Sequence, residues 1–384
     1  METRKLYYED SHLREFTARV LSCVETAKGF EVTLDATAFY PEGGGQACDL
    51  GTLGDANVLD VRERGESIVH LCDKAPEVGS EIRGVIDWQR RFDLMQQHSG
   101  EHMVSGVIHR RYGWHNVGFH MGSDVVTIDF DGVIPPEDLA GIEAEVNAGI
   151  WQNLPLRCWY PSPEELPKVG YRTKKELPWP VRVVEVPDFD KCACCGTHVK
   201  YTGEIGLVKL FNSIPCRGGS RMEMACGKRA VALLNRAYDQ NRQVSQAFSA
   251  KISETGAAAR RMNETLEQEK LRFGALQKKL FGFVAERYVN HGNVLHFEEN
   301  LDSVQIRELA DAIAEGCGGM AAVFSGTEEG GYAFALVTRQ GDLRPFGKAM
   351  TAALNGRGGG KPIFQQGRVQ AAKAQIETFF QENC

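Results

Sequence analysis

The stretch KCACCGTHVKYTGEIGL, residues 191–207, carries the strongest signal in this chain. It places the thiols Cys192, Cys194 and Cys195 close to His198, which follows Cys194 by four residues. Thiolate sulfur and imidazole nitrogen are the ligands that zinc prefers in a tetrahedral site. Adjacent thiols at 194 and 195 point in divergent directions, so they do not easily bind one ion together.

A second group of candidate ligands lies about a hundred residues earlier, in HSGEH, residues 98–102. Apolar residues recur three and four apart between Trp88 and Arg111, which predicts a helix there. His98 and His102 then lie on one face of that helix, one turn apart. If the fold brings this pair to the thiols, one zinc ion can be shared by both segments.

Two other sites fit parts of the same pattern. Cys192, Cys194, Cys195 and His198 could form a separate structural zinc site, and the two helical histidines could be merely packed or solvated. A thermolysin-like protease is disfavoured, because its motif requires Glu directly after the first histidine and this chain has Ser99.

Together the two motifs resemble the editing domain of alanyl-tRNA synthetase and its freestanding relatives, the AlaX proteins. By position, the resemblance implies a single Zn²⁺ per chain. Its four ligands are implied to be His98, His102, Cys194 and His198. The family's activity is hydrolysis of a wrongly attached amino acid, chiefly serine and also glycine, from tRNA(Ala).

The segment FYPEGGGQ, residues 39–46, is similar to a glycine-rich motif of the same family. A simple turn would explain its glycines but not the adjoining Gln. The resemblance implies that this motif helps bind substrate, through Gly43, Gly44, Gly45 and the amide of Gln46.

Further candidates come from positions where this chain departs from the synthetase pattern or matches it. Glu101, between the histidines, and His120 are candidate proton-transfer groups, with the substrate's own ribose hydroxyl as an alternative. Ser123 and Arg221 match synthetase residues near the editing pocket, and Thr37 or His120 could read a serine hydroxyl. A site that hydrogen-bonds this hydroxyl discriminates against alanine, which lacks it.

Composition sets the general class. The chain has 384 residues, 42% hydrophobic and 25% charged, which suits two or three globular domains. A net charge of −7 means that any nucleic acid must be held by local basic patches. Eleven cysteines, no export signal and no long apolar run predict reduced thiols, a cytoplasmic location and no membrane span.

We predict an α+β protein with four regions. Residues 1–87 form an N-terminal β-barrel with the glycine-rich motif, and residues 88–227 form the zinc-binding editing domain. Residues 228–288 lack Pro and form a helical connector of two long helices, which break near Thr255 and Gly256. Residues 289–384 form an α/β domain that resembles the DHH-associated domain of long-form AlaX proteins.

The resemblance also implies roles for the C-terminal region. Arg357 and Lys361, in GRGGGKP at 356–362, are expected to bind the tRNA, and the region is a possible homodimer contact. No aminoacylation domain is expected before residue 1. The competing hypotheses are a noncatalytic tRNA-binding protein with a structural zinc and a phosphodiesterase. The latter is disfavoured because the chain has no Asp-His-His motif.

Overall fold

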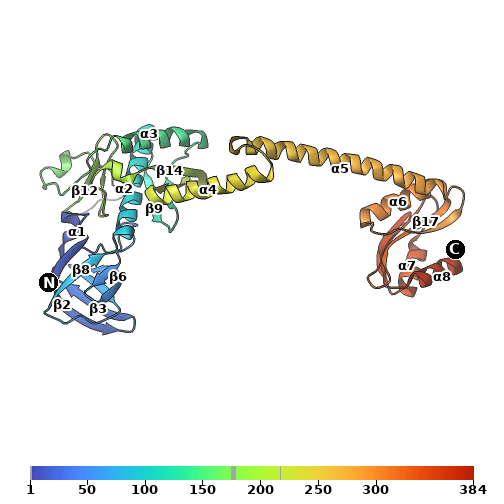
Figure 1. Ribbon diagram of the computed structural model, residues 1–384, viewed down its shortest axis with the longest axis horizontal. Helices are drawn as coiled ribbons and strands as arrows, with labels where there is room; N and C mark the ends of the chain where they lie inside the picture. The colour runs from blue at the N-terminus through green and yellow to red at the C-terminus, as the bar shows by residue number, and fades with distance from the viewer. Residues whose placement is uncertain (1, 174–178, 217) are drawn as a thin grey trace. The chain divides into compact units, whose positions relative to one another are not determined.

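The computed structural model describes residues 2–173, 179–216 and 218–384 (Figure 1). It divides into two compact units, Met1–Gln243 and Val244–Cys384, so the boundary falls within helix α4 (Gly227–Ala247). Helices and several separate sheets are both present, which confirms the mixed α+β prediction.

The first part of unit 1 is a closed barrel of six strands, drawn in blue in Figure 1. Its strands, in spatial order, are β2 (Glu15–Thr26), β3 (Gly29–Leu34), β7 (Ser67–Cys72), β6 (Ala56–Arg64), β5 (Gly51–Leu53) and β8 (Glu81–Ile86). Alternate residues such as Val32 and Leu34 are fully buried in its core, as the two-residue period of a strand requires. Beside it lie β1 (Arg4–Lys5), paired with β4 (Ala36–Thr37), and the short helix α1 (Leu6–Glu9).

Helix α2 (Trp88–Tyr112) follows the barrel and carries the first metal motif. The Asp87 side chain caps its start by accepting from the backbone N–H of Arg90, and Gly113 ends it with a φ of 76°. Arg91 anchors the helix to the barrel. Its buried guanidinium pairs with the equally buried Asp49 and donates to backbone carbonyls of residues 11 and 38.

Two sheets pack around the middle of α2. Their strands, in spatial order, are β14 (Val208–Cys216), β15 (Gly219–Cys226), β10 (Val126–Phe130) and β9 (Asn116–Met121) in one sheet, and β11 (Arg157–Trp159), β12 (Val183–Val186) and β13 (Asp190–Ala193) in the other. Helix α3 (Leu139–Trp151) and the 3-10 turns Pro136–Asp138, Leu166–Lys168 and Thr202–Ile205 complete this part. The resulting core is built from apolar residues of α2, α3 and the four-stranded sheet.

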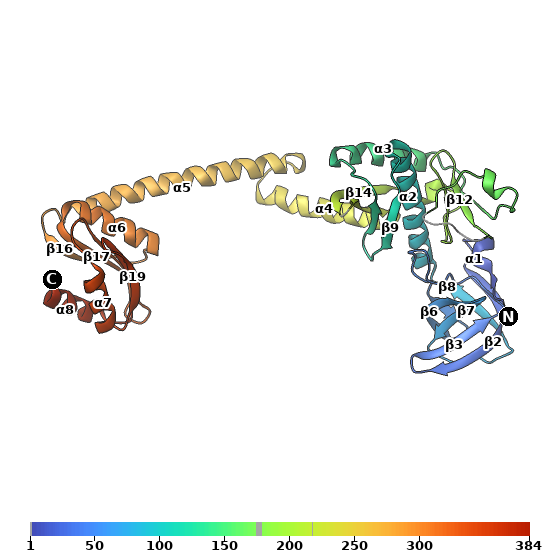
Figure 2. The same ribbon diagram turned by 180° about the vertical axis from the view of Figure 1, so that it is seen from behind.

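Unit 2 contains a five-stranded sheet between two helical layers (Figure 2). Its strands, in spatial order, are β16 (Gly292–Phe297), β17 (Gly318–Thr327), β18 (Gly331–Thr338), β20 (Phe364–Val369) and β19 (Arg357–Lys361). Its covering helices are α6 (Ser303–Gly316), α7 (Arg344–Ala353) and α8 (Lys373–Asn383). Ala321 and Val323 face the core with α6, whereas Ala322 and Phe324 face the core with α7 and α8.

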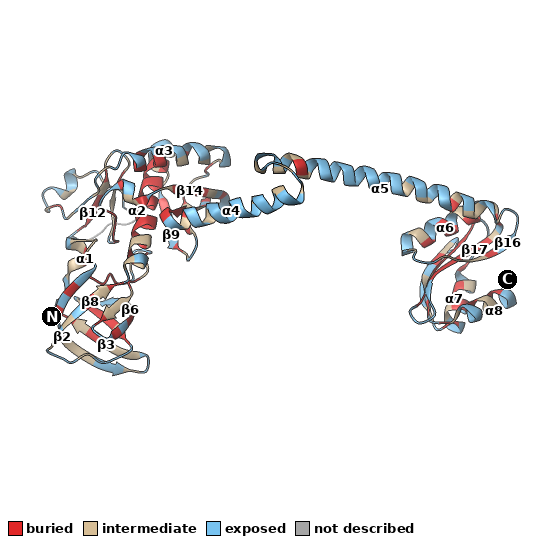
Figure 3. Cartoon of the chain, in the orientation of Figure 1, coloured by how far each residue is buried: buried red, intermediate tan, exposed pale blue. Residues whose placement is uncertain are grey.

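The predicted helical connector consists of two helices. Helix α4 ends at Ala247, a 3-10 turn covers Ile252–Glu254, and helix α5 runs over Thr255–Glu286. The break therefore lies directly before the predicted Thr255. Figure 3 shows α5 exposed along most of its length, and only Ala258 and Phe281 of its 32 residues are buried. No helix within the described ranges is long and apolar enough to cross a membrane.

Candidate metal centre

The two metal motifs meet in unit 1. His98 and His102 come from the buried middle of α2, and Cys194 and His198 come from the loop after β13. The four ligand atoms all lie within 4.8 Å of one another. The Cys194 sulfur is 3.4 Å from Nε2 of both His98 and His198. With Zn–S near 2.3 Å and Zn–N near 2.0–2.1 Å, the S···N edge of a tetrahedral zinc site is about 3.5 Å, so the cluster fits one such ion.

Each of the three imidazoles has a partner for its Nδ1 atom, which leaves Nε2 to face the centre. The pairs are His98 with Gln46 Oε1 at 2.9 Å, His102 with Asp190 Oδ2 at 2.8 Å and His198 with Ser99 Oγ at 3.2 Å. Such outer partners fix the tautomer and the orientation of metal-binding histidines. Their presence on all three rings is the arrangement of a metal site rather than of a packed histidine cluster.

The charge state of the cluster also suits a cation. Burial favours the neutral thiol, but the neighbouring imidazoles, His98 first, hold the pKa of Cys194 well below its usual range. Burial lowers the pKa of His198 to about 3, so this ring is neutral and free to donate a lone pair. Against the effect of burial, Cys194 and Asp190 raise the pKa of His102, so a metal ion would displace a proton from that ring. Thiolate and neutral imidazole are the forms that bind metal ions.

Glycine allows the ligand loop to approach α2 closely. A Cβ atom on Gly196 would lie only 2.1 Å from Cε1 of His98, so a side chain there would push the loop away. Gln46 holds the same loop from the other side. Its amide donates to Thr197 Oγ1 at 2.8 Å, and its Oε1 accepts from the Thr197 N–H at 3.1 Å.

Gln46 was predicted to offer amide donors to a substrate, but its contacts are with His98 and Thr197, and its side chain is 1% exposed. The structure thus places it among the residues that orient the cluster. The preceding glycines form the turn that positions Gln46, and within it the backbones of Gly43 and Gln46 pair. Gly45 is needed for close packing, because a Cβ atom there would lie 2.6 Å from Phe119. The Phe119 ring in turn stacks on His98, with 5.2 Å between centroids.

The alternative site built from the 191–198 segment alone does not match the structure. Cys195 is exposed, and Cys192 approaches His102 and Asp190 rather than the other thiols of the segment. Asp190 is already engaged, because it accepts from His102 and from Arg172 Nε at 2.7 Å. Burial raises the pKa of Cys192 to about 11, so its thiol stays protonated.

Glu101 lies beside the cluster on α2, and its side chain is buried. Its carboxylate accepts from Ser105 and, at 2.5 Å, from the amide of Asn116. The Oδ1 atom of Asn116 is buried without a hydrogen-bond partner among the described residues. Glu101 is therefore held by its own neighbours rather than exposed as a surface helix residue.

The structure does not bring His120, Ser123 and Arg221 to the cluster. Residues 119 and 120 point to opposite faces of β9, and Phe119 takes the face toward His98, so the exposed His120 points away. Ser123 lies exposed in the turn after β9. Arg221 pairs with Asp129 at 2.7 Å on the same outer face of the sheet as His120.

Thr37 is also placed away from the four ligands. Its hydroxyl lies inside the barrel, 2.8 Å from His70 Nε2, and accepts from the Phe39 N–H. Arg357 and Lys361 are found in unit 2, at the two ends of the exposed edge strand β19.

Sequence reasoning missed three supporting residues: Asp190, Arg172 and Arg182. Arg182, 6% exposed, donates to the carbonyls of Cys194 and Gly196 at 3.0 and 2.8 Å, and so fixes the ligand loop. A metal-binding histidine generally needs an acceptor behind it, which could have drawn attention to Asp190. Nothing in the sequence pattern distinguishes Arg172 or Arg182 from other arginines.

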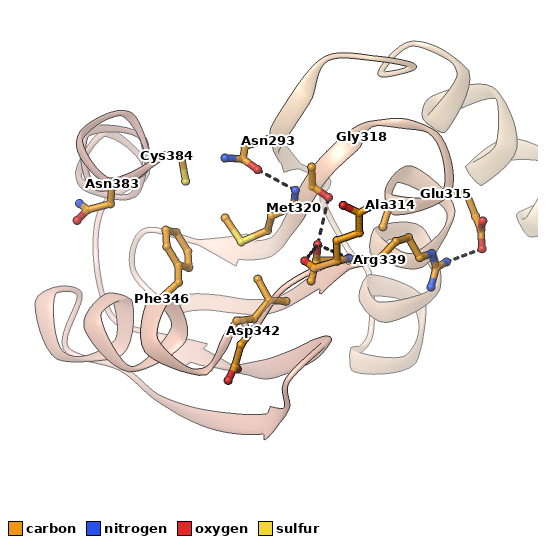
Figure 4. Close-up of a pocket in the computed structure, with 14 residues that line it drawn as sticks. Asn293, Ala314, Glu315, Gly318, Met320, Arg339, Asp342, Phe346, Asn383 and Cys384 are labelled. Carbon is orange, nitrogen blue, oxygen red and sulfur yellow. Dashed lines mark hydrogen bonds and ion pairs between the residues drawn. The ribbon is translucent and has the colours of Figure 1, made fainter.

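A cavity of about 460 Å³ lies in unit 2 and not at the metal cluster (Figure 4). Two of its polar side chains have partners there: Arg339 pairs with Glu315, and Asn293 accepts from the backbone N–H of Met320. None of the groups of possible metal ligands among the described residues lies in this cavity.

Comparison with known proteins supports the same region. A family profile described as "Threonyl and Alanyl tRNA synthetase second additional domain" matches residues 181–226, which include Cys194 and His198. A second profile, "tRNA synthetases class II (A)", matches residues 3–90.

Similarity to individual proteins extends over almost the whole chain. An alanine–tRNA ligase of Thermofilum pendens is 31% identical over 97% of this chain but only 43% of its own length. Proteins named alanyl-tRNA editing protein Aarsd1 are 25% identical in Danio rerio and 26% identical in Rattus norvegicus, and the match covers 96% and 97% of those proteins. These comparisons confirm the resemblance inferred from the motifs: the chain is similar to proteins named alanyl-tRNA editing protein over nearly its full length, and to 43% of the length of the Thermofilum pendens alanine–tRNA ligase.

Proposed function

We propose that this protein hydrolyses the ester bond of mischarged tRNA(Ala), chiefly Ser-tRNA(Ala) and also Gly-tRNA(Ala), at a zinc site, in the cytoplasm. The observation that carries the proposal is the convergence of His98, His102, Cys194 and His198, each histidine with an outer partner. This cluster lies in a chain that is similar over its length to proteins named for alanyl-tRNA editing.

In the reaction, water adds to the ester carbonyl and the bond to the ribose oxygen breaks. The products are the free amino acid and the ribose hydroxyl, which receives a proton from the water. Zinc, when bound, would supply a positive charge that orients a polar group of the substrate or water. His98, His102, Cys194 and His198 would hold it.

The protein's own residues would contribute positioning and proton transfer. Glu101 is the best-placed of the predicted proton-transfer groups, because it is buried beside the ligands whereas His120 points away. The Glu101→Gln variant should lower deacylation while retaining zinc. Full activity of this variant at every pH would remove Glu101 from the mechanism.

We propose that Arg357 and Lys361 bind phosphates of the tRNA. Strand β19 is a sheet edge on which all five residues are exposed, and Arg368 of the neighbouring strand lies opposite Arg357. Arg357, Lys361 and Arg368 thus place three positive charges along this edge, and the glycines between Arg357 and Lys361 leave the backbone accessible. Replacing Arg357 and Lys361 by Ala should weaken tRNA binding and its salt dependence, with hydrolysis of a simple seryl ester unchanged.

A second copy of the chain is the proposed partner of α5. Seven large apolar residues of this helix are each more than half exposed, and six of them lie along one seam. These six are Met262, Leu266, Phe273, Leu276, Leu280 and Phe283. Their spacing follows the alternating three- and four-residue steps of a coiled-coil seam, with Glu269 at the one polar position. An apolar seam is suited to a homodimer rather than to contact with RNA.

The deciding experiment measures release of serine from Ser-tRNA(Ala), glycine from Gly-tRNA(Ala) and alanine from Ala-tRNA(Ala). We expect rapid release of serine by the full chain, and loss of that activity in His98→Ala. A competing candidate is noncatalytic tRNA binding, which four protein ligands favour because they saturate a structural zinc. Tight tRNA binding without any release of serine would establish that alternative instead.

A further inference from the structure

One side of the metal centre is formed by the small sheet β11-β12-β13. Cys158, Val184 and Cys192 lie side by side across its three strands, on the face from which Asp190 reaches His102. Cys158 is exposed, so this face of the sheet extends from the buried ligands to the protein surface. The residues at its outer edge are therefore the first that a large substrate would meet.

Aromatic rings gather at this outer edge. The Tyr8 hydroxyl donates to the Cys195 carbonyl at 3.0 Å, and its ring lies 4.7 Å below the Arg182 guanidinium. Tyr160, which follows β11, contacts Tyr8 edge to face at 6.3 Å and is 48% exposed. Burial raises the pKa of the Tyr160 hydroxyl, and the Arg182 guanidinium opposes this rise.

Trp179 extends the same patch. Its indole Nε1 donates to the carbonyl of Pro161, the residue after Tyr160, at 3.4 Å, while 58% of the residue stays exposed. The polar atoms of Tyr8 and Trp179 are thus used within the protein, whereas much of the ring surface of Tyr160 and Trp179 faces solvent. Exposed rings beside a fixed cation are the features with which proteins bind unpaired nucleic-acid bases.

We propose that Tyr160 and Trp179, supported by Tyr8 and Arg182, form a stacking platform for the unpaired bases at the 3′ end of the charged tRNA. The inference rests on the proposed function and adds a location to it. Stacking on the platform would hold the terminal nucleotides at the outer edge of the small sheet. The ester would then lie along the sheet face that carries Cys158 and point toward the metal ligands. Recognition would depend on ring surface and not on base identity.

The test compares Tyr160→Ala, Tyr160→Phe and Trp179→Ala in the full-length, zinc-loaded protein. Trp151→Ala is the matched control, because Trp151 is a 74% exposed aromatic at the end of α3 with no described contact to Tyr160. Substrates are Ser-tRNA(Ala) and serine ethyl ester, which has no nucleotide. Zinc content is measured for every variant.

We expect Tyr160→Ala and Trp179→Ala each to raise KM for Ser-tRNA(Ala) about tenfold, in line with the contribution of one stacked base. Tyr160→Phe and Trp151→Ala should retain the wild-type KM, and hydrolysis of serine ethyl ester should not change. An unaltered KM in both alanine variants would overturn the platform. An equal loss on the ethyl ester would do the same, because it would indicate damage to the metal site.

Failure of the proposed function gives a different result. If the wild-type protein releases no serine from tRNA, binding of the uncharged oligonucleotide ACCA still tests the platform. Weaker binding by Tyr160→Ala than by Tyr160→Phe would support it, and equal binding would reject it.

Discussion

Helices α2 and α5 both depart from the ordinary amphipathic pattern, but in opposite directions. Helix α2 buries 16 of its 25 residues, including Arg91, Glu101 and the two histidine ligands. Helix α5 buries two of its 32 residues and exposes a seam of large apolar side chains. Polar groups can be buried in α2 because each has a partner within the chain, whereas no described residue of unit 2 covers the apolar seam of α5. We infer that α2 is completed by the fold and α5 by a second molecule.

The largest expected effect concerns the ligands that α2 shares with the loop. Cys194→Ala should abolish stoichiometric zinc and reduce deacylation more than about 100-fold, since losing even an outer partner of a ligand costs about 10–100-fold. Cys195→Ala is the control, because that thiol is exposed and outside the cluster. Zinc content and serine release from Ser-tRNA(Ala) are the measurements. Full zinc content in Cys194→Ala would contradict the ligand set.

The next effect tests whether α2 depends on its buried pairs. Arg91→Ala leaves Asp49 as an unpaired buried charge and should lower the free energy of unfolding by about 3–5 kcal/mol. The exposed Arg64–Glu31 pair serves as the control, and Arg64→Ala should leave the urea midpoint nearly unchanged. Equal midpoints for the two variants would mean that the anchor between α2 and the barrel is dispensable.

For the apolar seam of α5 we expect the opposite result: a substitution there weakens association of two copies but does not unfold the protein. Leu276→Lys removes one Leu from each copy, about 1.5 kcal/mol each or 3 kcal/mol per dimer, which corresponds to a roughly 100-fold weaker dimer. Leu271→Lys makes the same chemical change at a residue that is 75% exposed and lies outside the seam. Sedimentation equilibrium distinguishes the two, and a monomeric wild-type protein would reject the seam as an interface.

The smallest effect concerns the residue behind His102. Asp190→Ala should weaken zinc binding by about 10–100-fold, because His102 then loses the acceptor that orients it. Glu185→Ala is the control, as Glu185 lies on the opposite face of the same sheet and pairs with Lys191. Competition with a chelator measures both affinities. An unchanged affinity in Asp190→Ala would show that α2 positions its ligands without outside support.

The pattern of the sequence was sufficient for the regular elements. Helical spacing predicted α2, and the absence of Pro predicted the connector that α4 and α5 form. These features depend on neighbours within a few residues, so periodicity reveals them. The break lies close to the predicted Thr255 and Gly256, which are the first two residues of α5.

The roles of single polar residues were harder to predict. Gln46 looked like a group that offers donors to a substrate, yet it orients His98 and Thr197. His120 looked like a proton-transfer group, yet the alternation of β9 turns it away from the cluster. In both cases the residue type indicated possible chemistry, but the direction of the side chain depended on which strand or loop packed against α2.

The sequence by itself determined which residues can bind a metal ion, because a four-residue spacing on a helix fixes His98 and His102 on one face regardless of the rest of the chain. Only the tertiary structure decided that Cys194 and His198 join them, and that Gln46, Asp190 and Ser99 stand behind the rings. The physical reason is distance along the chain. Contacts between segments about fifty to a hundred residues apart depend on how α2 packs against the barrel and the sheets, and no local pattern records that packing.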